Sequence, residues 1–307
     1  MERTDLVRSR FSLPIPTNFS FLRTAFSHGW YALPPFSFTK EAGQLHRVLL
    51  LRDEIIVHCT LTGYDHAIHV KVASEEELGL QQRTEITTQL RTCLRLDEDF
   101  SDFYREARKH PEFRWIPRRG AGRMLRAPSV FEDTVKMICT TNCTWALTTV
   151  IVTNLVKMFG KAGAGSSRAF PTPEALAGSS DRILRKEVKA GYRSPYLLEL
   201  AEKVASKQLD LEAWRSSPLS TEELFEHMRS VKGIGPYAAG NIMKLVGRYD
   251  YLGLDSWVRS QYYALHHKGR TVKDSTIERH YAGYGRWRGL FFWLEMTRHW
   301  HDEKLFL

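Results

Sequence analysis

The first part of the chain alternates short hydrophobic runs with turn residues. In "RVLLLRDEIIVHCTLTGYDHAIHVKVAS" three stretches rich in β-branched residues are separated by the polar segments 52–54 and 62–65. Hydrophobic runs of strand length between such turn signals predict an antiparallel meander. The segment 28–38, "HGWYALPPFSF", is expected to be an extended loop, because its prolines cannot occupy a helix interior.

Beyond residue 94 the hydrophobic residues recur every three or four positions, which is the period of an amphipathic helix. One helical stretch is expected from the start signal Pro128-Ser129 to Gly160. Further helices are predicted over residues 221–230, 255–267 and 285–300. Most of the chain after the meander is therefore expected to be helical.

The Gly/Ser-rich segment 160–173 resembles a phosphate-binding loop only superficially. It lacks the Gly-Lys-Ser/Thr ending, and no predicted strand precedes it, so we interpret it as a linker. The whole pattern predicts an α+β protein with a β-rich domain over residues 1–93 and a helical body over residues 94–307.

Composition narrows the partners and the compartment. The chain has 307 residues, 43% of them hydrophobic, and a formal net charge of +9, which suits a polyanion such as nucleic acid or an anionic membrane. No hydrophobic run reaches the length of a membrane span, and the N-terminal residues lack the apolar core of a signal peptide. The four cysteines fit neither a disulfide framework nor a zinc site. We expect a reducing intracellular compartment and no secretion.

The stretch "SVKGIGPYAAG", residues 230–240, predicts two helices joined by a tight hairpin. Gly233 and Gly235 allow unusual backbone angles and close approach, and Pro236 suits the first turn of a helix. Such a turn exposes backbone N–H groups at a helix N-terminus, where an anion such as a DNA phosphate can bind. An ordinary tight turn between helices is the alternative.

Asp255 follows twenty residues after Gly235, in a short apolar run just before a predicted helix. Its carboxylate is therefore predicted to lie beside the hairpin. The simpler interpretation is an N-cap, since aspartate is a preferred N-cap residue.

Together, "VKGIGPYAA" and "LGLDSWVR" resemble the hairpin and the catalytic segment of the helix-hairpin-helix-GPD superfamily of base-excision DNA glycosylases. The segments 122–160, 184–204 and 284–298 are similar to the helical body of 8-oxoguanine glycosylases and of bacterial 3-methyladenine glycosylase II. The resemblance covers residues 118–300 and implies a β-rich, TBP-like N-terminal domain. It places the hairpin at 223–247 and the catalytic loop at 250–257.

The resemblance implies an enzyme that flips one nucleotide out of duplex DNA and cuts the bond between base and sugar. Asp255 matches the catalytic aspartate, which stabilises the positive charge that develops on the sugar. Gly233, Ile234 and Gly235 match the backbone donors to a DNA phosphate. Lys232 is either a further phosphate contact or a solvated surface lysine. The hairpin of this family often holds a monovalent cation through backbone carbonyls.

Three residues match the part of the family that enters the DNA. Tyr192 and Arg193 match a wedge in which a ring enters the base stack and an arginine probes the opposite strand, or else they form an ordinary helix terminus. Asn142 matches an asparagine that lines the void left by the flipped base. Leu147 stands where 8-oxoguanine glycosylases have an arginine, which leaves recognition of the opposite base open.

Tyr237 departs from the bifunctional members, which carry a lysine nucleophile at this position. Tyrosine cannot form a Schiff base, so the resemblance implies a glycosylase without lyase activity. Tyr237, Trp257 and Trp293 match positions around the flipped base, and Trp145, Trp287 and Phe292 are further candidates. Each of these aromatics is also explained by ordinary helix packing.

An aromatic pocket favours electron-poor, cationic bases, so alkylated purines such as 3-methyladenine are the expected substrate. Gly289 occupies the place of a base-reading glutamine in 8-oxoguanine glycosylases, which argues against that substrate. Oxidised or deaminated bases and a non-catalytic DNA-binding module remain as alternatives. A membrane-surface protein is disfavoured, because no cationic amphipathic helix is flanked by linkers.

No cysteine follows Cys143, so the cysteine cluster that holds iron and sulfur in endonuclease III relatives is absent from this sequence. We expect no cofactor apart from the monovalent cation at the hairpin. The expected partner is double-stranded DNA containing a damaged base, bound by a monomer. The expected location is the nucleus in a eukaryote and the nucleoid in a prokaryote.

Overall fold

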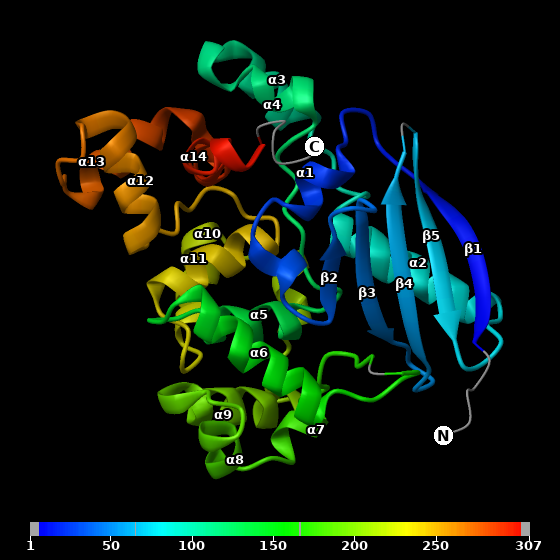
Figure 1. Ribbon diagram of the computed structural model, residues 1–307. Helices are drawn as coiled ribbons and strands as arrows, with labels where there is room; N and C mark the ends of the chain where they lie inside the picture. Colours follow the sequence, from blue (N-terminus) through cyan, green and yellow to red (C-terminus); the bar gives the residue numbers. More distant parts are fainter. Residues whose placement is uncertain (1–5, 65, 166, 302–307) are drawn as a thin grey trace.

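The computed structural model describes residues 6–64, 66–165 and 167–301. The outer ends of the two predicted domains and residue 65 in the predicted turn lie outside these ranges. The N-terminal part is a five-stranded antiparallel sheet with the order β1-β5-β4-β3-β2 (Figure 1). Its strands are β1 (Val7–Pro14), β2 (Phe36–Thr39), β3 (Gln44–Leu50), β4 (Ile56–Gly63) and β5 (Ala67–Ser74).

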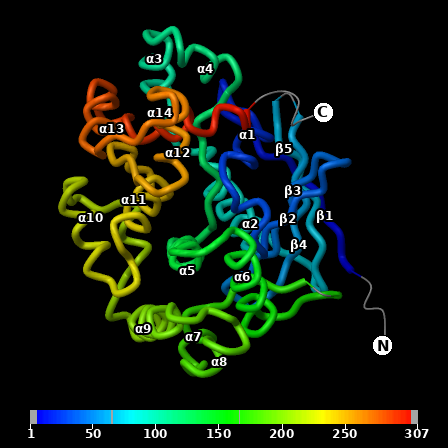
Figure 2. Tube along the Cα trace, turned by 60° about the vertical axis from the view of Figure 1, so that its left-hand side comes forward, coloured from blue at the N-terminus to red at the C-terminus, as the bar shows by residue number. Residues whose placement is uncertain are grey.

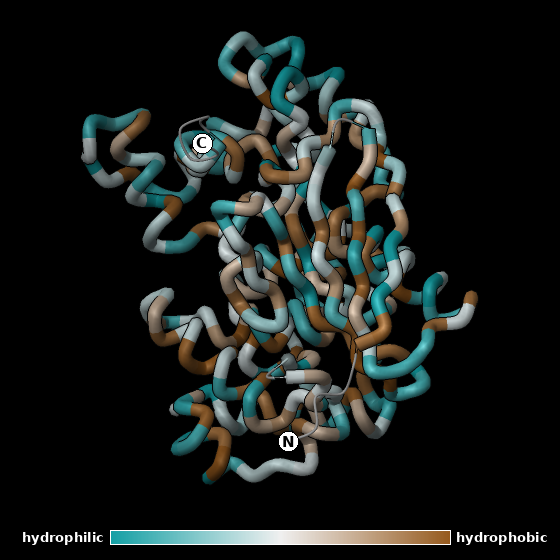
Figure 3. The backbone as a smooth tube through the Cα atoms, turned by 45° about the vertical axis from the view of Figure 1, so that its right-hand side comes forward, coloured by the Kyte–Doolittle hydropathy of each residue, from teal (hydrophilic) through white to brown (hydrophobic). Residues whose placement is uncertain are grey.

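The strands follow the alternation of hydrophobic and polar residues. Along β5 the side chains of Ile68, Val70 and Val72 are buried, while the residues between them face the other side of the sheet. The same alternation is visible along the neighbouring strands in Figure 3. The predicted meander is confirmed as β3, β4 and β5, and strands β1 and β2 extend it at both edges.

The segment 28–38 is more ordered than the predicted extended loop. Gly29–Ala32 form one 3-10 turn, η1, and Phe36 begins β2. The prolines at 34 and 35 lie between these two elements, where neither a helical nor a ladder hydrogen bond is lost.

Helical structure begins earlier than predicted, because the short helix α1 (Phe21–Ala25) and then the first long helix, α2 (Leu80–Leu94), both start before residue 94. Helix α2 lies against one face of the sheet (Figure 1). Its buried side chains include Ile86, Leu90 and Leu94, which recur at four-residue spacing within an otherwise polar stretch. The hydrophobic pattern did not predict this helix, because most of its residues are polar.

The helical body is larger than the sheet domain. The short helix α1 (Phe21–Ala25) belongs to the N-terminal part. The helices of the body are α3 (Ser101–Lys109), α4 (Trp115–Arg119), α5 (Val130–Cys139), α6 (Trp145–Phe159), α7 (Pro173–Ala177), α8 (Asp181–Lys186), α9 (Ser194–Ala205), α10 (Thr221–Arg229), α11 (Pro236–Leu245), α12 (Ser256–His267), α13 (Asp274–Tyr281) and α14 (Arg288–Met296). The three helices predicted after residue 220 are confirmed as α10, α12 and α14. The α+β class is confirmed as well.

The stretch from Pro128 to Gly160 forms two helices instead of the one predicted. A turn over residues 140–144 separates α5 from α6, and within it Asn142 has a φ of +46°. Thr144 then caps α6, since its side chain accepts a hydrogen bond from the N–H of Leu147. The run Thr-Thr-Asn-Cys-Thr is rich in residues that prefer caps and turns, which explains the break.

Two hydrophobic cores underlie this body. One combines the sheet with buried residues of α5, α6, α9, α10 and α11, and the other combines α3, α4, α12, α13 and α14. In Figure 2 the elements of the second core gather at one end of the molecule and α7, α8 and α9 at the other. Within the described ranges, no helix is both long and apolar enough to span a bilayer.

Candidate active site

The hairpin between α10 and α11 has the backbone that its glycines predict. Gly233 has a φ of +89°, and a Cβ atom there would lie 2.7 Å from the Cβ of Tyr196, so only glycine fits. Gly235 is the exposed N-cap of α11, no side chain caps it, and Pro236 begins the helix. The N-terminus of α11 is therefore open to an anion.

The other two hairpin residues have partners within the protein. Ile234 is buried, and its N–H donates to the carbonyl of Val231 at 3.1 Å, so this N–H serves the turn. Lys232 is exposed and forms an ion pair with Glu199 at 2.9 Å.

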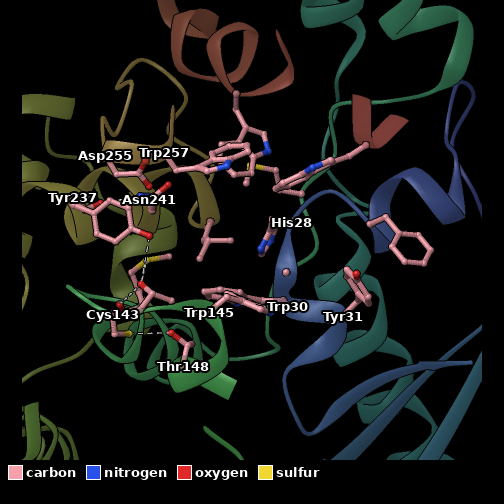
Figure 4. Close-up of a pocket in the computed structure, with 18 of the residues that line it drawn as sticks. His28, Trp30, Tyr31, Cys143, Trp145, Thr148, Tyr237, Asn241, Asp255 and Trp257 are labelled. Carbon is pink, nitrogen blue, oxygen red and sulfur yellow. Dashed lines mark hydrogen bonds between the residues drawn. The ribbon is translucent and has the colours of Figure 1, made fainter. Parts of the chain in front are cut away.

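Asp255 is the N-cap of α12 and also faces a cavity. Its Oδ1 accepts a hydrogen bond from the N–H of Val258 at 2.7 Å, which orients the carboxylate. The side chain is half-buried and lines a cavity of about 660 Å³ (Figure 4). The N-cap interpretation and a role in the cavity are thus compatible.

A buried lysine ties the loop before Asp255 to helix α11. Lys244 has no exposed surface, and its Nζ donates to the carbonyl of Leu252 at 2.7 Å and to Oδ1 of Asn241 at 3.3 Å. Burial lowers the pKa of Lys244 from 10.5 to about 7, and the nearby carboxylate of Asp255 acts in the opposite direction. The contact holds the loop in place at a point close to the carboxylate.

Aromatic rings form much of the cavity wall. Trp257, Trp293 and Trp300 lie together, with the rings of Trp257 and Trp300 stacked at 5.3 Å. The indole N–H of Trp293 donates to the carbonyl of Ser27 at 3.0 Å, which joins α14 to the N-terminal part. Figure 4 shows Tyr237 near Asp255, with Trp145 across the cavity from Trp257.

The polar groups of the cavity are largely uncharged. The hydroxyl of Thr140 lies 3.4 Å from that of Tyr237, and burial raises the pKa of the Tyr237 phenol further above 10. His28 contacts the carbonyl of Leu125 through Nε2, and burial lowers its pKa to about 4, so the imidazole is neutral at physiological pH. Asn241 spans the space between Tyr237 and Lys244.

Helix α5 holds the segment that carries His28. Asp133 accepts a hydrogen bond from the indole N–H of Trp30 at 2.8 Å, and Lys136 donates to the carbonyl of Leu33. Glu132 binds both Lys136 and Arg47 of β3 in an ion cluster that is almost fully buried. Sheet, α5 and the segment 28–36 therefore share one polar framework.

Two of the predicted DNA-entering residues, Asn142 and Tyr192, lie together on the surface. Asn142 Nδ2 donates to the hydroxyl of Tyr192 at 3.3 Å, and that hydroxyl also contacts Thr141. The side chain of Tyr192 is 45% exposed, and Leu147, on the helix α6 that follows Asn142 in the sequence, is exposed as well. Arg193 differs from the expectation for a residue that probes the opposite strand, because its guanidinium is buried and donates to the carbonyls of Ala190 and Thr141.

The resemblance puts Gly289 in the base pocket, at the position of a base-reading glutamine, but Gly289 is not among the residues that line the cavity beside Asp255. Its N–H donates to the carbonyl of Tyr249 at 2.7 Å, and a Cβ atom would lie 2.0 Å from the carbonyl oxygen of Tyr251. Glycine is needed there for helix packing, and a longer side chain has no room. Trp287 and Phe292 likewise belong to the second core, whereas Trp145 lines the cavity.

Sequence reasoning missed several lining residues, among them His28, Thr140, Cys143, Asn241 and Trp300. Asn241 had a local signal, since it follows Tyr237 by one helical turn. The others come from segments far apart in the chain, and no local pattern indicates that they meet. No group of three or more His, Cys, Asp or Glu side chains that could hold a metal ion occurs in the part of the chain that the structure describes.

No protein-family model matches the chain. Among curated proteins, the N-glycosylase/DNA lyase of Saccharomyces cerevisiae is 24% identical over 144 residues, which are 41% of this chain and 38% of that protein. The match thus spans well under half of the yeast protein's length.

Solved structures match over nearly the whole chain. The 3-methyladenine DNA-glycosylase of Archaeoglobus fulgidus has a TM-score of 0.73 and 21% identity, with 94% of this chain and 98% of that chain covered. The 8-oxoguanine glycosylase/lyase of Clostridium acetobutylicum, in its apo-form, has a TM-score of 0.72 and 16% identity, with 97% and 98% covered. This chain has a DNA glycosylase fold. Within that fold, Tyr237 of α11 and Asp255 of the loop that follows α11 line the same cavity.

Proposed function

We propose that the protein is a monofunctional DNA glycosylase that removes alkylated purines, such as 3-methyladenine, from double-stranded DNA. One observation carries this proposal: the Asp255 carboxylate opens on a cavity lined by Tyr237, Trp257 and Trp293. The names of the similar proteins support glycosylase activity in general, and they mention both an alkylated base, 3-methyladenine, and an oxidised base, 8-oxoguanine. The choice of substrate therefore rests on the chemistry of this cavity.

In the proposed reaction a damaged nucleotide leaves the base stack and its base enters the cavity. The bond between C1′ and the base nitrogen breaks, and its electron pair leaves with the base. The positive charge that develops on the sugar is stabilised by the Asp255 carboxylate, and water then adds to C1′. The water proton passes to Asp255 or to solvent, and an abasic site remains.

The cavity suits a base that carries positive charge. Asp255 is the only carboxylate among its described lining residues, and the indole and phenol faces attract cationic rings. His28 is neutral, and Lys40, the one lysine or arginine among the described lining residues, is exposed to solvent. An N-alkylated purine is also a good leaving group, because it departs as a neutral base and needs little acid catalysis. Oxidised and deaminated bases stay as the alternative substrates.

The absence of lyase activity is part of the proposal. Tyr237 stands where bifunctional relatives have their lysine, and a phenol cannot form a Schiff base. The amine of Lys244 is buried and donates to the Leu252 carbonyl, which keeps it from acting as a substitute nucleophile. Borohydride treatment during base release tests this directly, and a trapped covalent complex would contradict it.

The same surface is proposed to hold the DNA. The open N-terminus of α11 binds a phosphate through the Gly235 region, and Lys232 adds charge beside it. Backbone carbonyl groups of the turn over residues 231–235 would hold the monovalent cation that the resemblance implies. Tyr192 enters the stack next to the flipped nucleotide, with Asn142 beside it.

The test is a panel of duplexes that each contain one alkylated, oxidised or deaminated base. Alkali-dependent strand cleavage reports which base is released. Asp255→Asn should reduce release from the alkylated duplex by at least about a thousandfold while the Kd for DNA stays within about threefold. Tight DNA binding without release of any base would favour a non-catalytic DNA-binding module, and full activity of Asp255→Asn would remove this carboxylate from the mechanism.

A further inference from the structure

The cavity beside Asp255 extends beyond the space that a two-ring base requires. Its volume of about 660 Å³ lies well inside the range of about 300–1,000 Å³ that encloses whole drug-sized ligands. Figure 4 shows Asp255 and Tyr237 at one end, Trp145 and Trp30 along one wall, and Tyr31 beyond Trp30 at the other end. A methylated purine placed against Asp255 leaves the Tyr31 end unfilled.

The unfilled end has its own chemistry. The rings of Phe26 and Tyr31 pack edge to face at 4.5 Å, and Phe38 of β2 contacts both. Lys40 directly follows β2, in the turn that leads to β3, and its exposed side chain lines the cavity. We call Phe26, Tyr31 and Lys40 the distal subsite.

The wall between the two ends is flat and aromatic. A Cβ atom on Gly29 would lie 2.2 Å from the Cη2 atom of Trp145, so the indole rests directly against the backbone of η1. Trp30 continues this wall, and its indole is fixed by Asp133. A substituent on a base that lies against Asp255 can therefore extend along this wall toward Tyr31.

The two ends of the cavity carry opposite charges. Asp255 provides the only carboxylate and Lys40 the only lysine or arginine among the described lining residues. His28 lies on the cavity wall between Asp255 and Tyr31 and is neutral. The cavity is thus complementary to a ligand with a cationic ring system and an anionic group some distance from it.

We infer that the distal subsite binds an anionic substituent on an enlarged base, and that purines carrying a carboxyalkyl group on a ring nitrogen are substrates. Such a base has the positive ring charge that suits Asp255 and the aromatic walls, and a carboxylate that Lys40 can pair with. The inference rests on the proposed glycosylase function and deepens it.

The experiment compares duplexes that contain one N7-methylguanine, N7-hydroxyethylguanine or N7-carboxymethylguanine. Single-turnover base release is measured for the wild type, Lys40→Gln and Tyr31→Ala, with Lys71→Gln as the control. Lys71 is an exposed lysine of β5 that does not line the cavity. Hydroxyethyl and carboxymethyl groups have similar size, so their comparison isolates the charge.

The wild type should release all three bases. Lys40→Gln should slow release of the carboxymethyl base about fivefold and leave the hydroxyethyl base unchanged, because a partly exposed ion pair contributes a modest free energy. Tyr31→Ala should slow both larger bases relative to the methyl base, and Lys71→Gln should have no effect. A wild type that releases only the methyl base would overturn the inference. Equal losses on all three duplexes with Lys40→Gln would overturn it too, since Lys40 would then be a DNA backbone contact.

A titration with the free base separates this inference from the proposed function. Free N7-carboxymethylguanine should quench the fluorescence of the cavity tryptophans, with a Kd that Lys40→Gln raises and Lys71→Gln does not. If this binding occurs while no duplex releases a base, the subsite is correct and the glycosylase proposal is wrong. If methylated bases are released but the free carboxymethyl base binds equally to Lys40→Gln, the subsite is wrong and the glycosylase proposal remains.

Discussion

Replacing Lys244 by methionine should change how the stability of the protein depends on pH. The side chain is fully buried between Leu252 and Asn241, and burial lowers the pKa of its amine to about 7. In the unfolded chain the pKa returns to about 10.5. Between these two values the unfolded chain binds a proton that the folded protein has lost.

The sign and size of the effect follow from this difference. Where the unfolded state binds more protons, the free energy of unfolding rises with pH, by at most about 1.4 kcal/mol per pH unit for one group. From pH 7 to pH 9 the folded Lys244 goes from half-protonated to neutral, while the unfolded lysine stays charged. The wild type should therefore gain about 2 kcal/mol relative to Lys244→Met over this interval.

Urea unfolding followed by tryptophan fluorescence at pH 7 and pH 9 measures this quantity, since groups common to both proteins cancel in the comparison. Lys232→Met is the matched control, because that lysine is exposed on the same hairpin and stays charged in both states over this range. Stability curves of the wild type and Lys244→Met that run parallel from pH 7 to pH 9 would refute the reasoning.

Two further predictions test packing and DNA entry. Gly289→Ala should lower the free energy of unfolding by about 3 kcal/mol or more, because its Cβ would overlap the Tyr251 carbonyl. Gly283→Ala is the control, since that position is open and the free energy of unfolding should change little. Urea unfolding measures both variants, and equal stabilities would disprove the close packing at Gly289. Tyr192→Ala should slow base release from duplex DNA about tenfold through lost stacking and leave release from single-stranded DNA unchanged. Single-turnover rates on both substrates check this, and equal losses on the two would argue against a wedge.

Local patterns accounted for much of the fold. The strands β3, β4 and β5 and the helices α10, α12 and α14 each bury a face whose hydrophobic residues repeat at the period of the element. Prediction failed where that signal was weak or divided. Helix α2 is mostly polar, and the turn over residues 140–144 interrupts a hydrophobic stretch that continues the helical period on both sides.

The site shows the same division. Gly233, Pro236 and Asp255 stood out in the sequence because a tight turn, a helix start and an N-cap each favour one residue type at one position. Tyr237 was named only because the resemblance aligns it with the lysine of bifunctional glycosylases. Gly289 was singled out only through the resemblance, as the position of a base-reading glutamine. The structure shows that the backbone of residues 249–251 lies directly against it.

The sequence alone determined the hairpin and the N-cap carboxylate, since these depend on local backbone conformation, and its resemblance to a family marked the tyrosine as a replacement for a lysine. Only the tertiary structure decided which residues share the cavity. His28, Thr140 and Trp300 come from three separate parts of the chain and line the same cavity. Such contacts depend on how whole elements pack against one another, and the hydrophobic pattern around any one of these residues does not indicate its distant neighbours.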